Sequence, residues 1–271
     1  MKVPRTTLSP ALLGGVALAV AALACGDIPT FQEGVAYISP VILPAPAVAL
    51  GDTLRDSTGA VAPLQLFGID ADGDTVRTIT PVFVVTTVPG PTVTLTPANL
   101  VIGDSVRPVQ IVGQVGSRLQ TPVATLDVVR QPDSITATVA TSARFPAPTG
   151  TDVTSIATLG VSVTSPPATA GTTVVPRAGV KSIIVRYEVT RVFPATATIP
   201  DTTLVLLDET GRFLLPTGRA LSDTTDQAGS ASRRIRAIPL GFDSVEISVS
   251  ANNLRGVPLK GSPIRFVVTT R

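Results

Sequence analysis

The chain has 271 residues, with 21 lysines and arginines against 19 aspartates and glutamates. Two of the basic residues and none of the acidic ones precede Cys25, so the remainder carries no formal net charge. Nucleic-acid binding through a broad positive field is therefore not expected. The sequence has no histidine and one cysteine, which excludes His-dependent nucleophile activation, His-containing metal sites and an intramolecular disulfide within this chain.

The first 24 residues predict an export signal. Lys2 and Arg5 precede an apolar run over 11–24, which is shorter than the roughly 20 apolar residues that a bilayer span requires. The tetrapeptide that ends at Cys25, Ala-Leu-Ala-Cys, resembles the lipobox of bacterial lipoproteins. The resemblance implies a lipid on Cys25 that anchors the protein to a membrane. Gly26 after it is similar to the pattern of lipoproteins that are sent to the outer membrane.

The remaining composition favours β-structure in two regions. Val, Thr and Ile recur, with 25 prolines and 22 glycines between them, as is typical of short strands and turns. After a tether over residues 25–35, the expected regions are 36–132 and 133–271. Residues 25–150 carry a net charge of −4 and the rest +4, and this difference could help the two regions to dock on each other.

The first region predicts a series of short strands in chain order. Prolines confine 37–50 to an edge strand or an extended lead-in. Alternation over 63–69 predicts a half-buried strand, and the apolar run 81–88 predicts a more fully buried one. Further strands are expected at 92–96, 105–112 and 123–129.

The second region continues the pattern, and its strongest strand signal lies at 180–190. The Pro- and Thr-rich stretches 146–153 and 165–175 are interpreted as loops. Other strands are expected at 135–141, 159–164, 204–207, 222–238, 243–251 and 264–270.

Turn residues in the first region are similar to those of the second group of bacterial Ig-like domains (BIG2). The resemblance rests on 48–52, 68–73 and 93–103, which hold a Gly-Asp pair, an Asp-Gly turn and an Asn-containing hairpin. It implies a β-sandwich over 36–132, with Phe83 near the position of the family tryptophan.

The second region resembles the Ig-like repeats of the invasin and intimin family (BIG1). Its turn residues Thr225, Asp226, Gly229 and Ala231 fit the motif, as do Gly241, Val245 and Ile247 in the strand that follows. Such repeats mostly act as stalks, and some bind surface partners. The two resemblances together imply two tandem Ig-like β-sandwiches.

Asp70, Asp72 and Asp74 form the candidate metal site, because three carboxylates in alternation could present oxygens to calcium. However, Gly73 precedes the third acid, and no glutamate follows at the distance that an EF-type loop needs. The pattern therefore favours a solvated hairpin turn, and no metal is expected there.

Arg233, Arg234 and Arg236 form the candidate ligand-binding cluster. On a strand, Arg234 and Arg236 would share one face, and Arg233 would join Ile235 on the other. Such a cluster could meet anionic lipid or polysaccharide. The alternative is a charged outer face or an edge that is protected against strand pairing.

No catalytic residue and no cofactor are expected. A Ser-Lys dyad would need Lys181 or Lys260, the lysines that remain after Cys25, and Lys181 is expected to be a surface residue at the start of a strand.

The sequence thus favours a non-catalytic envelope lipoprotein that acts as an adhesion module, a binding module or a stalk at the outer membrane or cell surface. Its expected partners are the membrane, through Cys25, and a cell-surface protein or polysaccharide. Two alternatives stay open, a structural subunit that assembles through strand edges and a carbohydrate-binding accessory protein.

Overall fold

The computed structural model describes residues 34–270, apart from 77, 87–91, 117–118, 147–153, 171–172, 195–203, 209, 212–218 and 239–241. Within these residues every regular element is a β-strand. No helix long and apolar enough to cross a membrane occurs in this part of the chain. The all-β fold class is therefore confirmed, whereas the expected signal and Cys25 lie outside the described residues.

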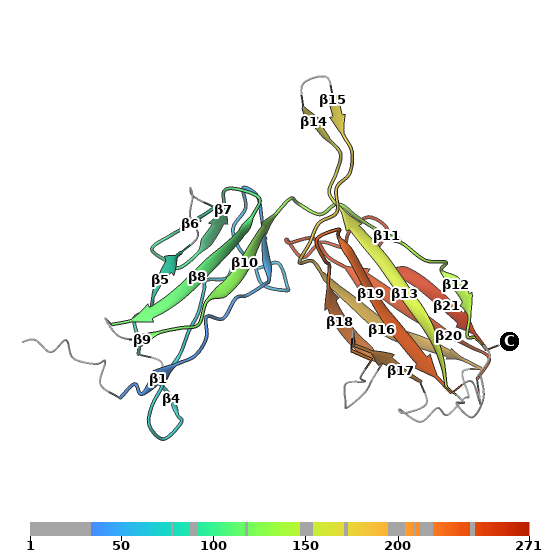
Figure 1. The fold of residues 1–271 in the computed structure, drawn as a ribbon, viewed down its shortest axis with the longest axis horizontal. Helices are drawn as coiled ribbons and strands as arrows, with labels where there is room; N and C mark the ends of the chain where they lie inside the picture. Colours follow the sequence, from blue (N-terminus) through green and yellow to red (C-terminus); the bar gives the residue numbers. More distant parts are fainter. Residues whose placement is uncertain are drawn as a thin grey trace, which may run out of the picture.

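Residues 37–129 form the first of two β-sandwiches, coloured blue to green in Figure 1. One sheet has the order β2-β10-β8-β5, with β9 paired to β8, and a smaller sheet has the order β1-β3-β4, while β6 and β7 form a hairpin. The strands are β1 (Tyr37–Ile38), β2 (Ala47–Ala49), β3 (Gly68–Ile69), β4 (Thr75–Val76), β5 (Val82–Val85), β6 (Val93–Leu95), β7 (Val101–Gly103), β8 (Pro108–Val115), β9 (Leu119–Gln120) and β10 (Ala124–Val129).

Residues 134–269 form the second sandwich, coloured yellow-green to red in Figure 1. Its two sheets have the orders β11-β13-β19-β17 and β12-β21-β20-β16-β18, and β14 and β15 form a hairpin that projects away from both sandwiches. The strands are β11 (Ser134–Ala137), β12 (Ser142–Arg144), β13 (Ser155–Thr164), β14 (Ala168–Ala170), β15 (Thr173–Val175), β16 (Ile184–Phe193), β17 (Leu204–Leu207), β18 (Ala220–Thr224), β19 (Ser230–Ala237), β20 (Ser244–Ala251) and β21 (Ile264–Thr269).

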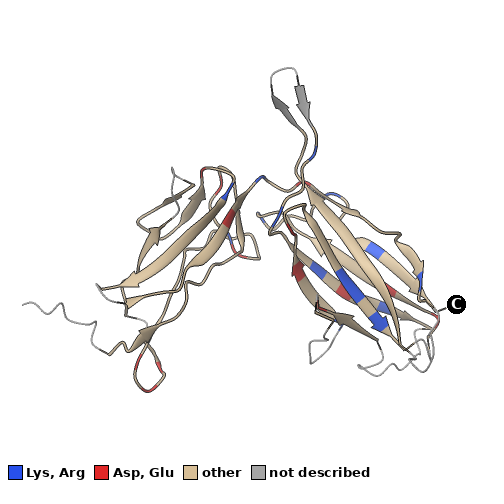
Figure 2. Ribbon diagram, in the orientation of Figure 1, with Lys and Arg blue, Asp and Glu red and all other residues tan. Residues whose placement is uncertain are grey.

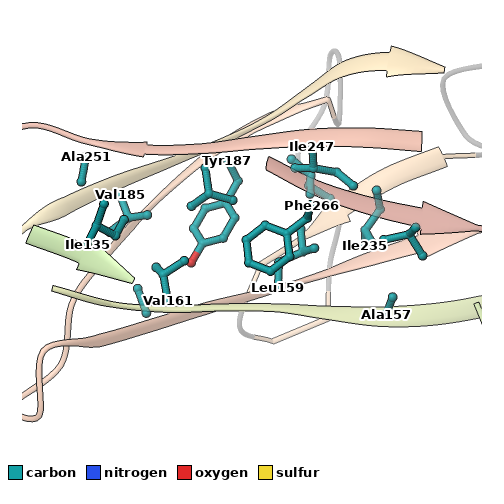
Figure 3. Close-up of a cluster of buried hydrophobic side chains, with 14 of the residues drawn as sticks. Ile135, Ala157, Leu159, Val161, Val185, Tyr187, Ile235, Ile247, Ala251 and Phe266 are labelled. Carbon is teal, nitrogen blue, oxygen red and sulfur yellow. The ribbon is translucent and has the colours of Figure 1, made fainter. Parts of the chain in front are cut away.

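Strict alternation of side chains builds the core of the second sandwich. Along β20 every second residue is apolar and buried, while the serines and Glu246 between them are half-buried on the outer face. Tyr187 on β16 lies in the middle of this core, and its hydroxyl points toward Val161 on β13 (Figure 3). The two sheets are thus joined by interdigitated apolar side chains, as in other sandwiches of this size.

Both sandwiches begin in the same way. In the first, β1 pairs with β3 in one sheet, and β2 then pairs in parallel with the last strand, β10, in the other. In the second, β11 pairs with β13, and β12 then pairs in parallel with the last strand, β21. The first segment of each domain therefore crosses from one sheet to the other and closes an edge of each.

Three stretches differ from the sequence-based expectation. The stretch 222–238 was expected to be one strand, but it holds parts of β18 and β19, which lie in different sheets and are separated by a turn at 225–229. The run 81–88 was expected to be more fully buried than 63–69, but β5, its described part, lies at the edge of its sheet, and Val82 is 57% exposed. The stretch 165–175 was expected to be a loop, yet it contains the paired strands β14 and β15. An apolar run has the same pattern at the centre and at the edge of a sheet, so only strand order could decide the position of β5.

The sheets divide at residues 130–133. β10 ends at Val129 and β11 begins at Ser134, and no strand of the described residues pairs with a strand of the other sandwich. Figure 2 shows that charged residues cross many strands of the second sandwich, while the strands of the first are mostly uncharged.

Candidate functional site at the joint between the sandwiches

The three aspartates of the candidate metal site lie in an exposed turn. The carboxylate oxygen Oδ1 of Asp70 accepts hydrogen bonds from the backbone N–H groups of Asp72 (3.0 Å) and Asp74 (2.8 Å). Gly73 adopts a φ of +92°, which a residue with a side chain rarely adopts. The turn thus uses the Asp70 side chain to hold its own backbone. No group of acidic residues suited to a metal ion occurs among the described residues.

The same turn recurs along the chain. In each copy an Asp or Asn accepts a side-chain hydrogen bond from the N–H two residues later, and a glycine at the fourth position has a φ between +77° and +92°. This geometry is an Asx turn, in which a short side chain replaces a backbone partner. The copies start at Asp56, Asp70, Asp208, Asp226 and Asn253. The stretch 70–74 is therefore a structural turn, as the sequence predicted, and the other copies have the same geometry.

The arginine cluster on β19 divides between two faces. Arg233 points into the sandwich, where its side chain is 9% exposed and its Nη2 donates to Oδ1 of Asp223 on β18 at 2.7 Å. Arg234 and Arg236 lie on the outer face, on either side of the buried Ile235. The prediction of which arginines share a face is confirmed, and the three do not form one binding patch.

Tyr187 lies close to this ion pair and has no hydrogen-bond partner for its hydroxyl within the described residues. Burial raises the pKa of Tyr187, the negative charge of Asp223 adds to the shift, and Arg233 opposes it. The tyrosine therefore stays neutral in the folded core and acts as a packing residue.

The two sandwiches meet where an Asx turn from each one touches the other. A Cβ atom added at Gly59 would lie 2.2 Å from the backbone carbonyl oxygen of Arg255, and one added at Gly256 would lie 2.4 Å from that of Thr58. Real Cβ contacts are essentially never shorter than 3.0 Å. Glycine is required at both turns, because any side chain would separate the two domains.

Asp52 supplies the charged contact beside these turns. Its carboxylate accepts hydrogen bonds from Nε of Arg255 in the second sandwich (2.6 Å), from the N–H of Thr53 (2.8 Å) and from Nη2 of Arg55 (3.3 Å). Burial by itself raises the pKa of Asp52. These hydrogen bonds outweigh that effect, and the bond from Arg255 contributes most among them, so the pKa of Asp52 lies below its usual value.

A second charged contact lies where the end of the first sandwich meets the start of β16. Asp127 on β10 pairs with Nζ of Lys181 at 2.6 Å and accepts a hydrogen bond from Oγ of Ser182 at 2.5 Å. The Lys181 side chain is only 17% exposed. The expectation of an ordinary surface lysine was wrong, because the other domain covers it.

Asp133 fixes the linker to the second sandwich. It pairs with Lys260 (2.9 Å) and with Arg177 (2.7 Å), and these two contacts hold the pKa of Asp133 below its usual value. Both lysines that a Ser-Lys dyad would require are thus engaged with aspartates. At the joint, acidic groups of the first domain pair with basic groups of the second. This agrees with the opposite net charges of the two regions of the sequence.

A cleft of about 330 Å³ opens beside the joint, within the size range of small-molecule sites. Three neighbouring strands contribute to the cleft. Arg186 on β16 lies opposite Ser222 on β18 and opposite Ser250 on β20. These two hydroxyls and that of Ser57 make no hydrogen bond within the described residues, so they are available to a small polar or anionic molecule. The cleft is lined by Ala45, Pro46, Arg55, Asp56, Ser57, Ser182, Ile183, Ile184, Arg186, Ser222, Ser250, Ala251, Asn252, Asn253 and Leu254, none of them aromatic.

No protein-family model matches the sequence of the chain, and no curated protein matches it. Among solved structures, the adhesin InvE of Yersinia pseudotuberculosis is 14% identical with a TM-score of 0.33; the match covers 89% of this chain and 62% of that one. Domains 4 and 5 of the S-layer protein SbsC are 10% identical, with coverages of 88% and 99% and a TM-score of 0.29. The collagen adhesin of S. aureus is 9% identical, with coverages of 88% and 94% and a TM-score of 0.24. At these values the likeness carries no conclusion about this chain, and the fold rests on the sheets described above.

Proposed function

We propose that this protein is a non-catalytic, exported module that is anchored to the outer membrane or cell surface through a lipid on Cys25 and acts there as a stalk or adhesion unit. The observation that carries the proposal is the joint, because a spacer must keep its domains in a fixed relation. Paired turns at Gly59 and Gly256, together with the Asp52–Arg255 and Asp127–Lys181 ion pairs, limit rotation of one sandwich against the other.

The arrangement suits a load-bearing role for a physical reason. A linker of four residues between two domains usually leaves them free to move unless an interface restrains them. Here the linker residue Asp133 is itself held by Lys260 and Arg177. Two rigid sandwiches with a restrained joint keep whatever they carry at a defined distance from the membrane.

The anchoring is tested by replacing Cys25 with serine and fractionating the cells. We expect the variant to leave the membrane fraction, while the purified protein keeps the far-UV β signal of the native chain. A variant that remained membrane-bound after salt and carbonate washing would contradict the lipid anchor.

The cleft supports a second candidate function, the binding of a polar or acidic group from a surface polysaccharide or protein. Its unpartnered hydroxyls surround Arg186, whose contact with Glu188 (3.2 Å) is exposed to solvent and therefore weak. A screen of glycans and envelope proteins against residues 26–271 tests this, with Arg186→Ala as the cleft variant. Arg234→Ala is the matched control on the outer face of the other sheet. Binding that both variants retain would exclude the cleft.

A further inference from the structure

The cleft beside the joint takes its walls from both sandwiches. The wall from the first sandwich is formed by residues 45–46 and 55–57, and the wall from the second by residues 182–184, 186, 222 and 250–254. A molecule that fills the cleft therefore touches both domains at once. The distance between the two walls depends on the joint, so the shape of the cleft depends on it too.

The two turns that meet at the joint also shape the cleft. Asp56 starts the turn of the first sandwich, and its Oδ1 accepts a hydrogen bond from the N–H of Thr58 at 2.9 Å. Asn253 starts the turn of the second sandwich, and its Oδ1 accepts a hydrogen bond from the N–H of Arg255 at 2.9 Å. Both Asp56 and Asn253 line the cleft. The turns whose glycines touch across the joint are thus also parts of the cleft walls.

The charged contacts of the joint reach the cleft as well. Arg55 lines the cleft, and its Nη2 donates to Oδ1 of Asp52 at 3.3 Å. The other oxygen of Asp52 accepts a hydrogen bond from Nε of Arg255 in the second sandwich. Ser182 also lines the cleft, and its Oγ donates to Asp127 in the first sandwich. Both turns and both charged contacts of the joint therefore include or adjoin a residue of the cleft.

The wall from the second sandwich suits a carboxylate. Arg186 presents its guanidinium there, and its contact with Glu188 is exposed and weak, so that a ligand can replace it. A guanidinium can bind a carboxylate through two parallel hydrogen bonds. Ser222 and Ser250 lie beside Arg186, and their hydroxyls make no hydrogen bond within the described residues. An acidic group therefore finds a cation and two hydroxyls on this wall.

The wall from the first sandwich suits hydroxyl groups. An ionised carboxylate has about four acceptor sites, and the turn of Asp56 uses three of them. The hydroxyl of Ser57 makes no hydrogen bond within the described part of the chain. Because Asp56 is negatively charged, it repels the carboxylate of a ligand and accepts hydrogen bonds from its hydroxyls. The two walls thus favour opposite ends of a ligand.

We propose that the cleft binds a sugar that carries a carboxylate, such as a uronic acid, and that this ligand stabilises the joint. The carboxylate pairs with Arg186 of the second sandwich, while hydroxyls of the sugar bind Asp56 and Ser57 of the first. The ligand needs both walls at the observed spacing, so it binds the closed joint more tightly than an open one and shifts the population toward it. This inference rests on the cleft function proposed above and adds the ligand class and the coupling to the joint.

An acidic sugar fits the cleft better than related ligands do. A neutral sugar would leave the guanidinium of Arg186 without an anion, and the cleft has no aromatic side chain to stack on a sugar ring. An acidic peptide would bring further carboxylates close to Asp56, which carries the same charge. A sugar with one carboxylate per ring has hydroxyls for the acidic wall and an anion for the basic one.

The first test measures the ligand class by calorimetry on residues 26–271, which include every described residue. We expect a galacturonic acid disaccharide to bind at least about tenfold more tightly than a galactose disaccharide or a glutamate dipeptide. Arg186→Ala should raise the Kd of the acidic sugar at least about tenfold, because a charge-assisted hydrogen bond is lost. Arg234→Ala, on the outer face of the other sheet, removes the same charge and should leave the Kd unchanged.

The second test measures the coupling with residues that lie outside the cleft lining. The double variant Lys181→Ala and Arg255→Ala removes two charged contacts between the sandwiches. It should raise the Kd of the acidic sugar about tenfold, because apparent affinity falls with the fraction of molecules in the binding-competent state. Small-angle scattering should show a larger radius of gyration for this variant, and saturating acidic sugar should restore the native value. The addition of Arg186→Ala should abolish that restoration at the same sugar concentration.

The outcomes separate this inference from the proposed function. If Arg186→Ala weakens binding but the double variant binds as the native chain does, the coupling is overturned and the cleft remains a binding site. If the galactose disaccharide or the glutamate dipeptide binds as tightly as the acidic sugar, the ligand class is overturned. If the native chain does not bind the acidic sugar, the whole inference is overturned, and the glycan and protein screen decides whether the cleft function falls with it. The Cys25→Ser result is independent of all three outcomes.

Discussion

The two sandwiches share their plan but differ in how much of it is buried. The second has strands of eight to ten residues, and its core gathers large side chains such as Leu159, Ile235 and Phe266. The first relies mainly on short strands, and its buried cluster is smaller. More of its large apolar residues are exposed, among them Val82, Val106 and Val123.

The comparison teaches that the two domains differ in how much apolar surface they remove from water. Stability rises with the apolar area that a domain removes from water, so the second sandwich is the scaffold of the molecule. The first domain keeps apolar surface at its edge strand, and such surface commonly marks interaction sites. The joint thus connects a domain with a small core to one with a larger core.

The largest expected effect on stability comes from truncating one buried side chain in the core of each sandwich. We expect Ile235→Ala and Leu126→Ala each to cost about 2–5 kcal/mol, because each removes a fully buried side chain. Leu126→Ala should move the urea transition of the first sandwich, and Ile235→Ala should move that of the second. The buried Tyr187 reports on the second domain by its fluorescence, since the chain lacks tryptophan and the other tyrosine, Tyr37, is exposed. Coincident shifts of both transitions in both variants would show that the domains unfold as one unit.

The next effect breaks the joint. Gly256→Val places a side chain where a Cβ alone would lie 2.4 Å from the carbonyl oxygen of Thr58. We expect the sandwiches to separate, with a loss of about 1–3 kcal/mol of coupling. Small-angle scattering should then give a larger radius of gyration. Gly73→Val is the control, since Gly73 also has a positive φ (+92°, against +78° at Gly256) but nothing lies within 4 Å of the added Cβ. If both variants keep the native radius, the turns do not hold the joint.

A smaller effect comes from pH. The pKa values of Asp52 and Asp133 are lowered in the folded protein, so their contribution is fully present above the unfolded value of about 3.9 and is lost as pH falls through the lower folded values. We expect stability from these groups to be constant between pH 5 and 8 and to decline below about pH 4. Asp52→Asn should flatten part of this decline in acid unfolding curves. An unchanged acid profile would assign the decline to other carboxylates.

The smallest effect concerns the aspartate turn. Asp70→Ala should cost about 1 kcal/mol, because two backbone N–H groups lose their acceptor. Asp72→Ala should change stability by less than about 0.5 kcal/mol, since the Asp72 side chain is exposed. Chelators should leave the melting temperature of the native protein unchanged. A clear drop on chelation that calcium reverses would restore the metal hypothesis.

The sequence by itself determined the β class, most strand positions and the nature of the turns. Alternation along 243–251 located β20, and the Asp-x-x-Gly pattern marked structural turns, because both signals depend on neighbours within a few residues. It also placed Arg234 and Arg236 on one face and Arg233 on the other, since the period of a strand is fixed by covalent geometry.

Only the tertiary structure decided where these pieces meet. The pairing of Asp127 with Lys181 joins residues from different domains, and no local pattern marks either one as covered. Likewise the apolar sequence of β5 does not show whether the strand lies at the centre or at the edge of a sheet. Strand order is set by contacts between residues far apart in the chain, so the edge position of β5 and the glycine contact at the joint are visible only in the folded molecule.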